Sequence, residues 1–396
     1  MAGALNGLKI LDFTTLLPGP FATMSLADMG ADVLRVVSGT RPDLADMLPP
    51  RVPGTKMSAA SAQLGRNKKL ITLNFKDKRA IEVIHKLLAE YDIVIEQFRP
   101  GVMDKLGLGY ESLKTVNPRL IYCSLTGYGQ TGPLSKKAGH DMNYIALSGM
   151  ASYSGTKKNG PSLFGMQVAD VASGSNNTMI GLLAAVIYRQ NTGKGQHVDI
   201  SMTDGMVAFN ASVGASFLVD GKEVGREGMF LNGGSVYDYY KTKDEQYVTF
   251  GGLEPQFFKA FCETIGRPDL IEGGCIRPDA EQVKEEIREI MATKTRDEWT
   301  DVFKGVDACF EPVLSLTEAF ASEQVKARNM VVEVPGPNGV KVKQIGSPIK
   351  FSETSPEYRS IGKSVADADT NDIMRTLGYS DAEIDAFEKE GVFGTM

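Results

Sequence analysis

The sequence predicts an α/β protein with a large, doubly wound parallel domain and a smaller α+β domain. In the first 210 residues, short β-branched runs alternate with helical patterns. That alternation is typical of parallel βαβ units with right-handed crossovers. From about residue 225, aromatic and charged residues alternate instead, as in an antiparallel hairpin. A length of 396 residues accommodates about two such domains.

The large domain is expected to hold six strands joined by helices. The predicted strands span 8–13, 31–36, 69–75, 93–98, 119–127 and 196–202. Helical patterns cover 20–30, 76–92 and 171–192, and glycines close the first and the last of them. In a doubly wound sheet the ligand crevice lies at the carboxyl ends of the strands.

The domain boundaries follow from the same change of pattern. We expect the large domain to comprise 1–224 and 326–396, and the small domain to comprise 225–325 with two amphipathic helices at 280–294 and 295–305. Near the C-terminus, Ser380 and Glu383 form a capping box at a helix start. The Pro-rich stretch 38–65 is weakly periodic, and loops of that length are usually functional or mobile.

Composition excludes several classes of protein. The net charge of −6 argues against a broad nucleic-acid surface. The first twenty residues lack the pattern of a signal peptide and no apolar run is long enough to span a membrane, so we expect neither a signal peptide nor a membrane span. The four cysteines lack any CxxC pattern and the histidines lack ligand spacing, so we expect reduced thiols and no metal site. The expected location is cytoplasmic, with neither nucleic acid nor membrane as a partner.

A glycine-rich G-x-G-x-x-G pattern follows the strand at 119–127. Its glycines are Gly127, Gly129 and Gly132. A dinucleotide fingerprint needs a helix next and an acidic residue about 20 positions on, but here Pro133 follows and that acid is missing. We therefore predict a glycine-rich turn without nicotinamide or flavin, whose backbone N–H groups can approach a ligand.

The three histidines differ in context. His85 lies on the exposed or flanking face of a helix, and His197 alternates with apolar residues in a strand, where a hydrogen-bonded structural histidine is expected. His140 follows a glycine on a loop, beside Asp141 and close to Tyr144, with no apolar periodicity around it. The local pattern leaves two interpretations of His140 open, a catalytic group and a loop residue with a satisfied hydrogen bond.

Two carboxylates sit at predicted helix starts. Asp170 precedes the long helix, where it is either an N-cap or a functional acid that the helix dipole keeps ionised. An ionised aspartate and a neutral histidine are what a two-base proton transfer needs. Glu254 precedes Pro255 at the start of a helix in the small domain, and by itself it is an ordinary first-turn acid.

Basic residues gather near the predicted strand ends in the first hundred residues. Positive charge at strand ends suits a phosphorylated ligand, and a solvated charged rim is the alternative. The residues are Arg35, Arg66, Lys68, Lys69, Lys76 and Arg99.

Taken in order, several segments resemble the class III CoA-transferase family. They include "PGPFATMSLADMGADVLRV", "EQFRPGVMDKLGLGY", "GYGQTGP", "AGHDMNYIALSG", "TGKGQHVDISMTDG" and "GGLEPQF". Within the family they are most similar to the α-methylacyl-CoA racemases, because the transferases usually lack the histidine of the "GHDMNY" segment. The resemblance runs from about residue 7 to the C-terminus.

This resemblance implies a fold and a set of roles. The implied protein is an interlocked homodimer, in which each chain has a large Rossmann-like domain and a small domain, and each active site lies between domains of different subunits. His140 and Asp170 match the opposing acid–base residues, and Glu254 matches a glutamate that orients or charges the histidine. The substrate is an acyl-CoA, and no cofactor is implied beyond the CoA of the substrate itself.

The resemblance also implies a CoA-binding set, with two departures from the family pattern. Ser38 stands where racemases commonly have an arginine, and 38–65 is longer than usual. The residues that match CoA-binding positions are Leu73, Asn74, Lys76, Arg99, Gly139, Asp141 and Tyr144.

The implied reaction is racemisation of 2-methylacyl-CoA thioesters. His140 removes the α-proton while protonated Asp170 donates on the other face, and backbone N–H groups near Asp170 stabilise the enolate oxygen. The alternatives are a CoA-transferase with Asp170 as nucleophile and a non-catalytic CoA-binding protein. The acyl group stays open among branched fatty acyl, bile-acid and arylpropionyl chains. Met142, Met150 and Met166 are expected to form either an acyl surface or core.

Overall fold

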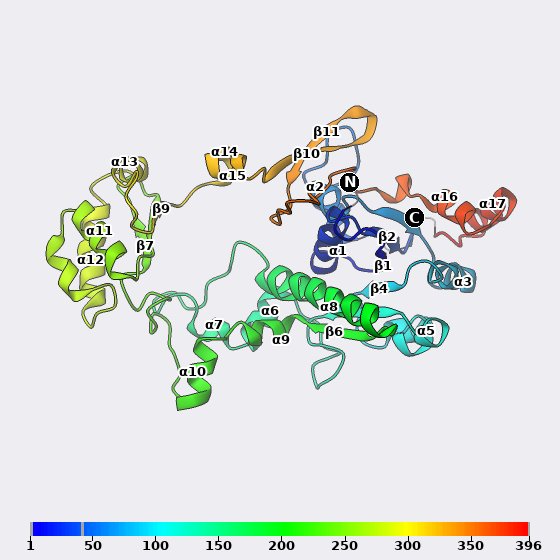
Figure 1. The fold of residues 1–396 in the computed structure, drawn as a ribbon, viewed down its shortest axis with the longest axis horizontal. Coiled ribbons are helices and arrows are strands. Elements are labelled where there is room, and N and C mark those ends of the chain that lie inside the picture. Colours follow the sequence, from blue (N-terminus) through cyan, green and yellow to red (C-terminus); the bar gives the residue numbers. More distant parts are fainter. Residues whose placement is uncertain (1–2, 41–42, 395–396) are drawn as a thin grey trace. The chain divides into compact units, whose positions relative to one another are not determined.

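A computed structural model describes residues 3–40 and 43–394 of the chain (Figure 1). The chain divides into two compact units. The large unit comprises Met1–Tyr144, Met166–Met206 and Gln324–Met396, and the small unit comprises Ile145–Gly165 and Val207–Glu323. The boundaries expected from the sequence, at 224/225 and 325/326, stay a prediction.

The large unit is built on a six-stranded, all-parallel sheet with the order β3-β2-β1-β4-β5-β6. This is the order of a doubly wound Rossmann sheet. The parallel α/β sheet predicted from the sequence is therefore confirmed, with every strand within a few residues of its expected place. The strands are β1 (Lys9–Asp12), β2 (Asp32–Val37), β3 (Lys69–Thr72), β4 (Ile93–Glu96), β5 (Ile121–Thr126) and β6 (His197–Ser201).

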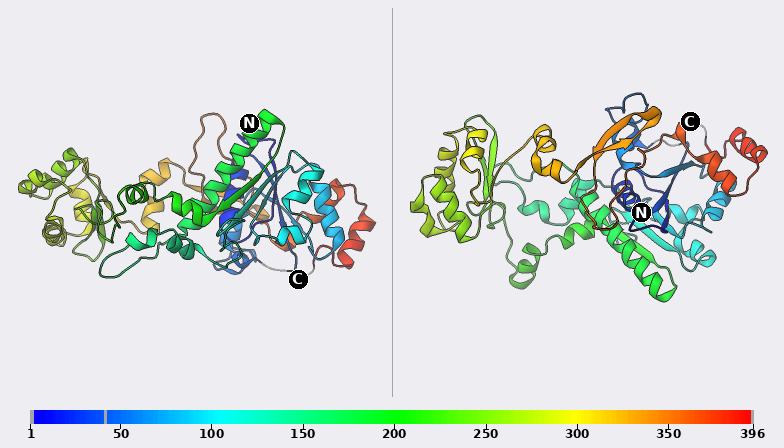
Figure 2. Two further views of the ribbon diagram at one scale, coloured as in Figure 1. Left: turned by 90° about the horizontal axis from the view of Figure 1, so that it is seen from below. Right: turned by 45° about the horizontal axis from the view of Figure 1, so that its top comes forward.

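Helices cover both faces of this sheet because alternate strand residues point to opposite sides. One face packs on α1 (Pro18–Asp28) and α8 (Asn176–Thr192) through a core that includes Ile10 and Ile93. Besides the short helix that carries Met103, four helices, drawn beside each other in Figures 1 and 2, pack on the other face, which includes Leu11 and Val94. They are α3 (Lys78–Leu87), α5 (Tyr110–Val116), α16 (Thr370–Thr376) and α17 (Asp381–Lys389).

Within the Pro-rich stretch 38–65, the described residues 43–65 form more regular structure than the sequence indicates. It contains a 3₁₀ turn, η1 (Leu44–Met47), and a short helix, α2 (Ala59–Leu64). A small core joins this stretch to an antiparallel hairpin, β10 (Val331–Pro335) with β11 (Lys341–Ile345). The sequence pattern does not predict this hairpin, because prolines at 335 and 337 interrupt the alternation of its residues.

Two further helix predictions can be compared with the structure. The helix expected over 171–192 begins as a π-helical segment, η2 (Ala169–Ser175), and continues as α8. The capping box of Ser380 and Glu383 at the start of α17 is confirmed. Three short helices cross the boundaries between the units: α6 (Asp141–Leu147), α9 (Met202–Ala208) and α15 (Glu323–Ala327). The remaining short elements of the large unit are α4 (Val102–Lys105), η4 (Pro337–Gly339) and η5 (Val365–Asp367).

The small unit contains the predicted antiparallel hairpin and amphipathic helices. Its sheet has the order β7-β8-β9, and stacked phenylalanines fill its core, with Phe303 and Phe310 at a centroid distance of 3.7 Å. The strands are β7 (Asp238–Lys241), β8 (Tyr247–Phe250) and β9 (Phe310–Pro312). The helices are α7 (Met150–Tyr153), α10 (Val213–Asp220), α11 (Pro255–Thr264), η3 (Pro268–Gly273), α12 (Ala280–Met291), α13 (Arg296–Val302) and α14 (Leu316–Ala321).

A membrane-crossing helix needs about 20 consecutive apolar residues. Across 3–40 and 43–394, none of the helices combines the length and the apolar character needed to cross a bilayer.

Candidate active site

The carboxyl edge of the large sheet gathers most of the predicted site residues. Because all six strands are parallel, their carboxyl ends meet at one edge. The loop after β3 carries Leu73–Lys76, the loop after β4 carries Arg99, and the loop after β5 leads to His140. The η2 segment with Asp170 is fixed at the same edge, since Ser175 Oγ donates to Pro18 O (2.6 Å) after β1 and Ser173 Oγ donates to Met202 O (2.7 Å) after β6.

The residues after β3 can offer a ligand different groups. Leu73 is buried in the core and its N–H donates to Val37 O (2.9 Å), so its side chain cannot reach a ligand. Asn74 forms a turn that is tied to the C-terminal segment, because its N–H donates to Val392 O (2.8 Å). Lys76 and Arg99 are exposed, and neither side chain forms an ion pair within the described ranges. Their assignment to CoA stays a prediction.

Half of the early basic cluster is held in buried or nearly buried ion pairs and is not available to a ligand. Arg66 forms a buried ion pair with Asp28 (2.5 Å), Lys68 forms one with Asp12 (3.1 Å), and Arg35 is paired with Asp43 (2.7 Å). These pairs hold helices and loops to the sheet. The interpretation of the whole cluster as a phosphate site is therefore wrong for these three residues, because buried charges need fixed partners.

A hydrogen-bond network at the end of β4, close in sequence to Arg99, runs from buried Glu96 and Ser124 to exposed His197. Glu96 accepts a hydrogen bond from the N–H of Phe98 (2.8 Å) and another from Ser124. The Ser124 hydroxyl also contacts His197 Nε2 (2.9 Å), and the His197 ring stacks on Tyr110 at a centroid distance of 5.2 Å. The expectation of a hydrogen-bonded structural histidine at 197 is confirmed.

Replacing Glu96 by glutamine should remove a pH dependence of stability. Burial raises the pKa of Glu96 from 4.5 to about 7. The folded state thus holds a proton that the unfolded state releases, and the free energy of unfolding falls by about 3 kcal/mol as the pH rises through this window. The neutral side chain of the Glu96→Gln variant does not ionise, so the variant does not lose this free energy. The free energy of unfolding of Glu96→Gln, measured relative to wild type, should therefore rise between pH 4 and 8.

Urea denaturation at several pH values measures this difference. Glu289→Gln on α12 is the matched control, since Glu289 is an exposed carboxylate. If Glu96→Gln and wild type lost stability in parallel across the window, the assignment of a raised pKa to Glu96 would be wrong.

The loop before His140 is shaped by a pair of tyrosines. Tyr144 is buried, its hydroxyl donates to Gly139 O (2.5 Å), and its ring meets the Tyr128 ring edge-on at 5.2 Å. A Cβ at Gly139 would lie 2.6 Å from the Tyr128 hydroxyl oxygen, and one at Gly127 would lie 2.4 Å from the Tyr144 ring. Both glycines are therefore needed for packing, which agrees with the prediction of a glycine-rich turn after β5.

His140 stands at the start of helix α6, and its side chain is exposed. Its backbone N–H donates to Asn143 Oδ1 (3.0 Å) and its carbonyl accepts from the Asn143 N–H (2.8 Å). This reciprocal pairing fixes the backbone at His140 and leaves the imidazole free to face solvent or a substrate.

Asp141 has a role that its sequence pattern did not predict. Its Oδ1 accepts hydrogen bonds from the N–H groups of Ala169 (2.6 Å) and Asp170 (3.1 Å), so it caps the start of η2. Asp170 itself lies in the first turn, and the N-cap interpretation of Asp170 is wrong. These two N–H groups are also not available to an enolate oxygen, which corrects that expectation. An acidic residue next to a histidine at the start of a helix could have indicated such a role. The segment that Asp141 caps, however, lies almost thirty residues further along the chain, so the sequence does not show that the two are in contact.

The carboxyl group of Asp170 is partly buried, and its pKa is raised from 3.8 to about 6. Burial is the largest cause, the negative charge of Asp141 adds to it, and the charge of His140 opposes it. From its place before a helix, Asp170 was expected to be kept ionised by the helix dipole. Instead, burial and a neighbouring carboxylate bring both of its protonation states within reach near neutral pH.

Glu254 belongs to the small unit. It occupies the N-cap position of α11 with Pro255 in the first turn, as expected, and its side chain is exposed. Its negative charge raises the pKa of the Cys309 thiol, after burial as the larger cause. Its predicted role beside His140 stays a prediction.

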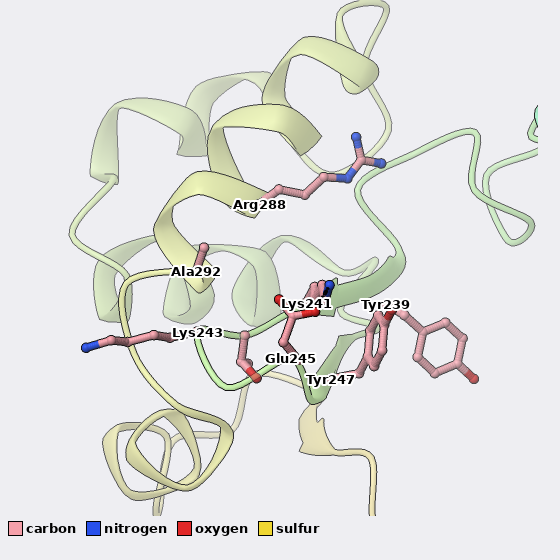
Figure 3. Close-up of a pocket in the computed structure, with 8 residues that line it drawn as sticks. Tyr239, Lys241, Lys243, Glu245, Tyr247, Arg288 and Ala292 are labelled. Atoms are coloured by element: carbon pink, nitrogen blue, oxygen red, sulfur yellow. Dashed lines mark ion pairs between the residues drawn. The ribbon is translucent and has the colours of Figure 1, made fainter.

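A surface hollow of about 370 Å³ lies on the small unit, and its lining includes none of His140, Asp170 and Glu254. Figure 3 shows its lining, with Tyr239 and Tyr247 on the hairpin and Arg288 on α12. Acidic neighbours already pair with two of its basic groups, Lys241 with Glu245 and Arg288 with Glu281. Within the described ranges, no three His, Cys, Asp or Glu side chains are grouped to hold a metal ion.

Comparison with known proteins gives the family. The profile of CoA-transferase family III matches residues 5–361. The chain is 34% identical over 356 residues to the succinyl-CoA:glutarate CoA-transferase of Homo sapiens, covering 88% of this chain and 80% of the relative. It is also 34% identical over 331 residues to the alpha-methylacyl-CoA racemase of Homo sapiens, covering 83% and 82% respectively.

The solved structures agree with this assignment. A crystal structure of a CAIB/BAIF family protein from Brucella suis superimposes with a TM-score of 0.83 and 29% identity, covering 95% of this chain and 100% of that one. Members of the family named above act on CoA thioesters, as transferases or as a racemase. The parallel sheet, the site residues at its carboxyl edge and these matches together show that the chain belongs to CoA-transferase family III.

Proposed function

We propose that this protein interconverts the (R)- and (S)-forms of 2-methylacyl-CoA thioesters. The observation that carries the proposal is the interaction between His140 and Asp170 at one edge of the sheet, with the pKa of Asp170 raised to about 6. An imidazole beside a carboxyl group that holds its proton up to about pH 6 suits a two-base proton transfer, because each group can take or give a proton.

In this mechanism one residue removes the α-proton and the other returns a proton to the opposite face. His140 takes the proton, the electron pair moves into an enolate of the thioester, and the Asp170 carboxyl protonates the α-carbon. The reverse direction exchanges the roles. The Asp141 N–H at the start of α6 donates to no acceptor in the described part of the chain, and it is our candidate donor to the enolate oxygen.

The carboxyl edge also suits the CoA part of the substrate. In the sheet, β3 and β5 are separated by three strands, which at the usual spacing is roughly 19 Å. We propose that Lys76 and Arg99 contact the phosphate groups and that the Gly139–Tyr144 loop contacts the thioester end. A ligand as long as CoA can reach both. The proposed reaction uses the side chains of the chain and the substrate's own CoA, with no further cofactor.

The interlocked homodimer is part of the same proposal. Helix α8 exposes an apolar stripe, with Ile180 65% and Ile187 59% exposed seven residues apart. Helix α10 exposes Val219 at 89%. Apolar surface of this kind usually marks an interface. Sedimentation equilibrium of the purified protein tests this part, and a monomer at micromolar concentration would contradict it.

The second candidate is a CoA-transferase. Asp170 would attack the acyl-CoA carbonyl and expel the CoA thiolate, giving an acyl–aspartyl anhydride. The thiolate would then attack the Asp170 carbonyl, releasing the carboxylic acid and leaving an enzyme thioester for the acceptor carboxylate. A transferase relative at the same identity as the racemase supports this candidate.

Exchange in deuterated water separates the two. A 2-methylacyl-CoA that is first shown to bind is incubated with the protein in D₂O, and the α-hydrogen is followed by proton NMR. The proposal predicts loss of the α-hydrogen signal together with racemisation. Absence of exchange, with transfer of CoA from succinyl-CoA to glutarate or trapping of Asp170 by hydroxylamine, would reject it in favour of the transferase.

A further inference from the structure

Asp141 links the two proposed acid–base residues. It follows His140 directly in the chain, and its Oδ1 accepts hydrogen bonds from the N–H groups of Ala169 (2.6 Å) and Asp170 (3.1 Å). We infer that Asp141 is a positioning residue whose carboxylate fixes the start of η2 relative to His140 and whose negative charge acts on the Asp170 carboxyl. The inference rests on the proposed function of His140 and Asp170, and it gives Asp141 a role different from CoA binding.

The geometry makes Asp141 the anchor nearest to the chemistry. η2 is π-helical, a conformation that often occurs at functional sites, and it is held further along by Ser173 and Ser175. Those two anchors act three and five residues beyond Asp170. The Asp141 bonds act on Asp170 itself and on the residue before it, so a displacement of this carboxylate moves the acid directly.

The charge of Asp141 has a second effect. A carboxylate so close disfavours ionisation of Asp170, and it is the largest cause of the raised pKa after burial. With a pKa of about 6, roughly one Asp170 in ten is protonated at pH 7. A pKa lowered by one unit would leave about one in a hundred. Asp141 therefore increases the fraction of the form that donates a proton.

Other ionisable groups lie on the elements around η2. Tyr144 of α6 interacts with the charge of Asp170, while Asp28 of α1 and Arg189 of α8 have ion-pair partners of their own. The remaining groups on β6 and α9 are His197, Asp199 and Asp204. The charges that act on the Asp170 carboxyl are those of Asp141 and His140.

Three substitutions separate the hydrogen bonds from the charge. Asp141→Asn keeps an oxygen acceptor and removes the charge, Asp141→Ser does the same with a smaller acceptor, and Asp141→Ala removes both. Glu383→Gln is the control, because Glu383 is also a capping carboxylate of the large unit but belongs to α17. The Asp170 carboxyl is followed in protein labelled with ¹³C at the aspartate side chains, with Asp170→Asn used to assign its signal.

We expect the Asp170 titration midpoint to move down by about half a unit or more in Asp141→Asn and Asp141→Ser. The rate of α-hydrogen exchange should show the same displacement of its pH profile. Asp141→Ala should in addition lower kcat by about 10–100-fold, because the acid is no longer held in place, while Asp141→Asn recovers most of that loss. Glu383→Gln should change neither the midpoint nor kcat.

The inference is overturned if the Asp170 midpoint stays at the wild-type value in both neutral variants, or if Asp141→Ala turns over substrate as fast as wild type. The NMR titration needs no catalytic activity. A moved midpoint in a protein that performs no exchange would reject the racemase proposal and keep the electrostatic role of Asp141.

Discussion

Replacement of His140 by alanine is expected to lower the rate of α-hydrogen exchange in a 2-methylacyl-CoA by at least about 10²–10⁴-fold. The exposed imidazole is the proposed base, and its backbone is fixed by Asn143. Alanine removes the base and leaves the start of α6 folded, since the hydrogen bonds there come from main-chain atoms of His140. Proton NMR in D₂O measures the exchange rate directly.

The matched control is His85→Ala on α3, which removes another partly exposed histidine of the large unit. It should exchange the α-hydrogen like wild type. If His140→Ala transferred CoA between carboxylic acids at the wild-type rate while Asp170→Ala did not, the transferase mechanism would replace the racemase mechanism. If His140→Ala and Asp170→Ala both lost exchange and CoA transfer, His140 would be needed in either reaction.

Replacement of Asp28 by alanine is expected to lower the free energy of unfolding by about 3–5 kcal/mol. Asp28 accepts hydrogen bonds from Arg66 Nε (2.9 Å), Arg66 Nη2 (2.5 Å) and the Asn67 side chain (2.8 Å), and both charged side chains are 1% exposed. Without the carboxylate, the guanidinium is left buried and without its counter-charge. Urea denaturation followed by circular dichroism measures the loss.

Two further variants show whether the unpaired charge is the cause. In Asp28→Ala/Arg66→Met both charges are gone, so part of the lost stability should return. Glu90→Ala breaks the exposed pair with Lys9, and it should cost less than about 1 kcal/mol. An Asp28→Ala variant as stable as Glu90→Ala would contradict the assignment of this pair to the fold of the large unit.

Much of the fold was predictable because it depends on local patterns. The runs "LKILDF", "ADVLRV" and "IVIEQF" are apolar enough to be strands buried on both faces, and helical patterns between them required parallel pairing. The capping box at Ser380 was also local, since both of its residues lie within four positions. The hairpin at 331–345 was missed, because prolines conceal its alternation and its partner is the distant stretch 38–65.

The candidate site was predictable in its residue types and less so in its connections. His140 and Asp170 were selected from their neighbours and from the family resemblance. Their charge interaction, the raised pKa of Asp170 and the cap that Asp141 provides depend on burial and on contacts across 29 residues of chain. Likewise, the six early basic residues looked equivalent, and packing paired three of them with buried acids.

The sequence by itself determined the order of strands and helices, the family, and which side chains are chemically capable of moving a proton. These depend on residue type and on spacing along the chain. The tertiary structure decided which of those side chains act on one another and in which protonation state. Desolvation and charge interactions depend on the distances between segments that are far apart in the sequence. Asp141 can therefore bind the backbone at Asp170 only because the fold brings α6 and η2 together at the carboxyl edge of the sheet.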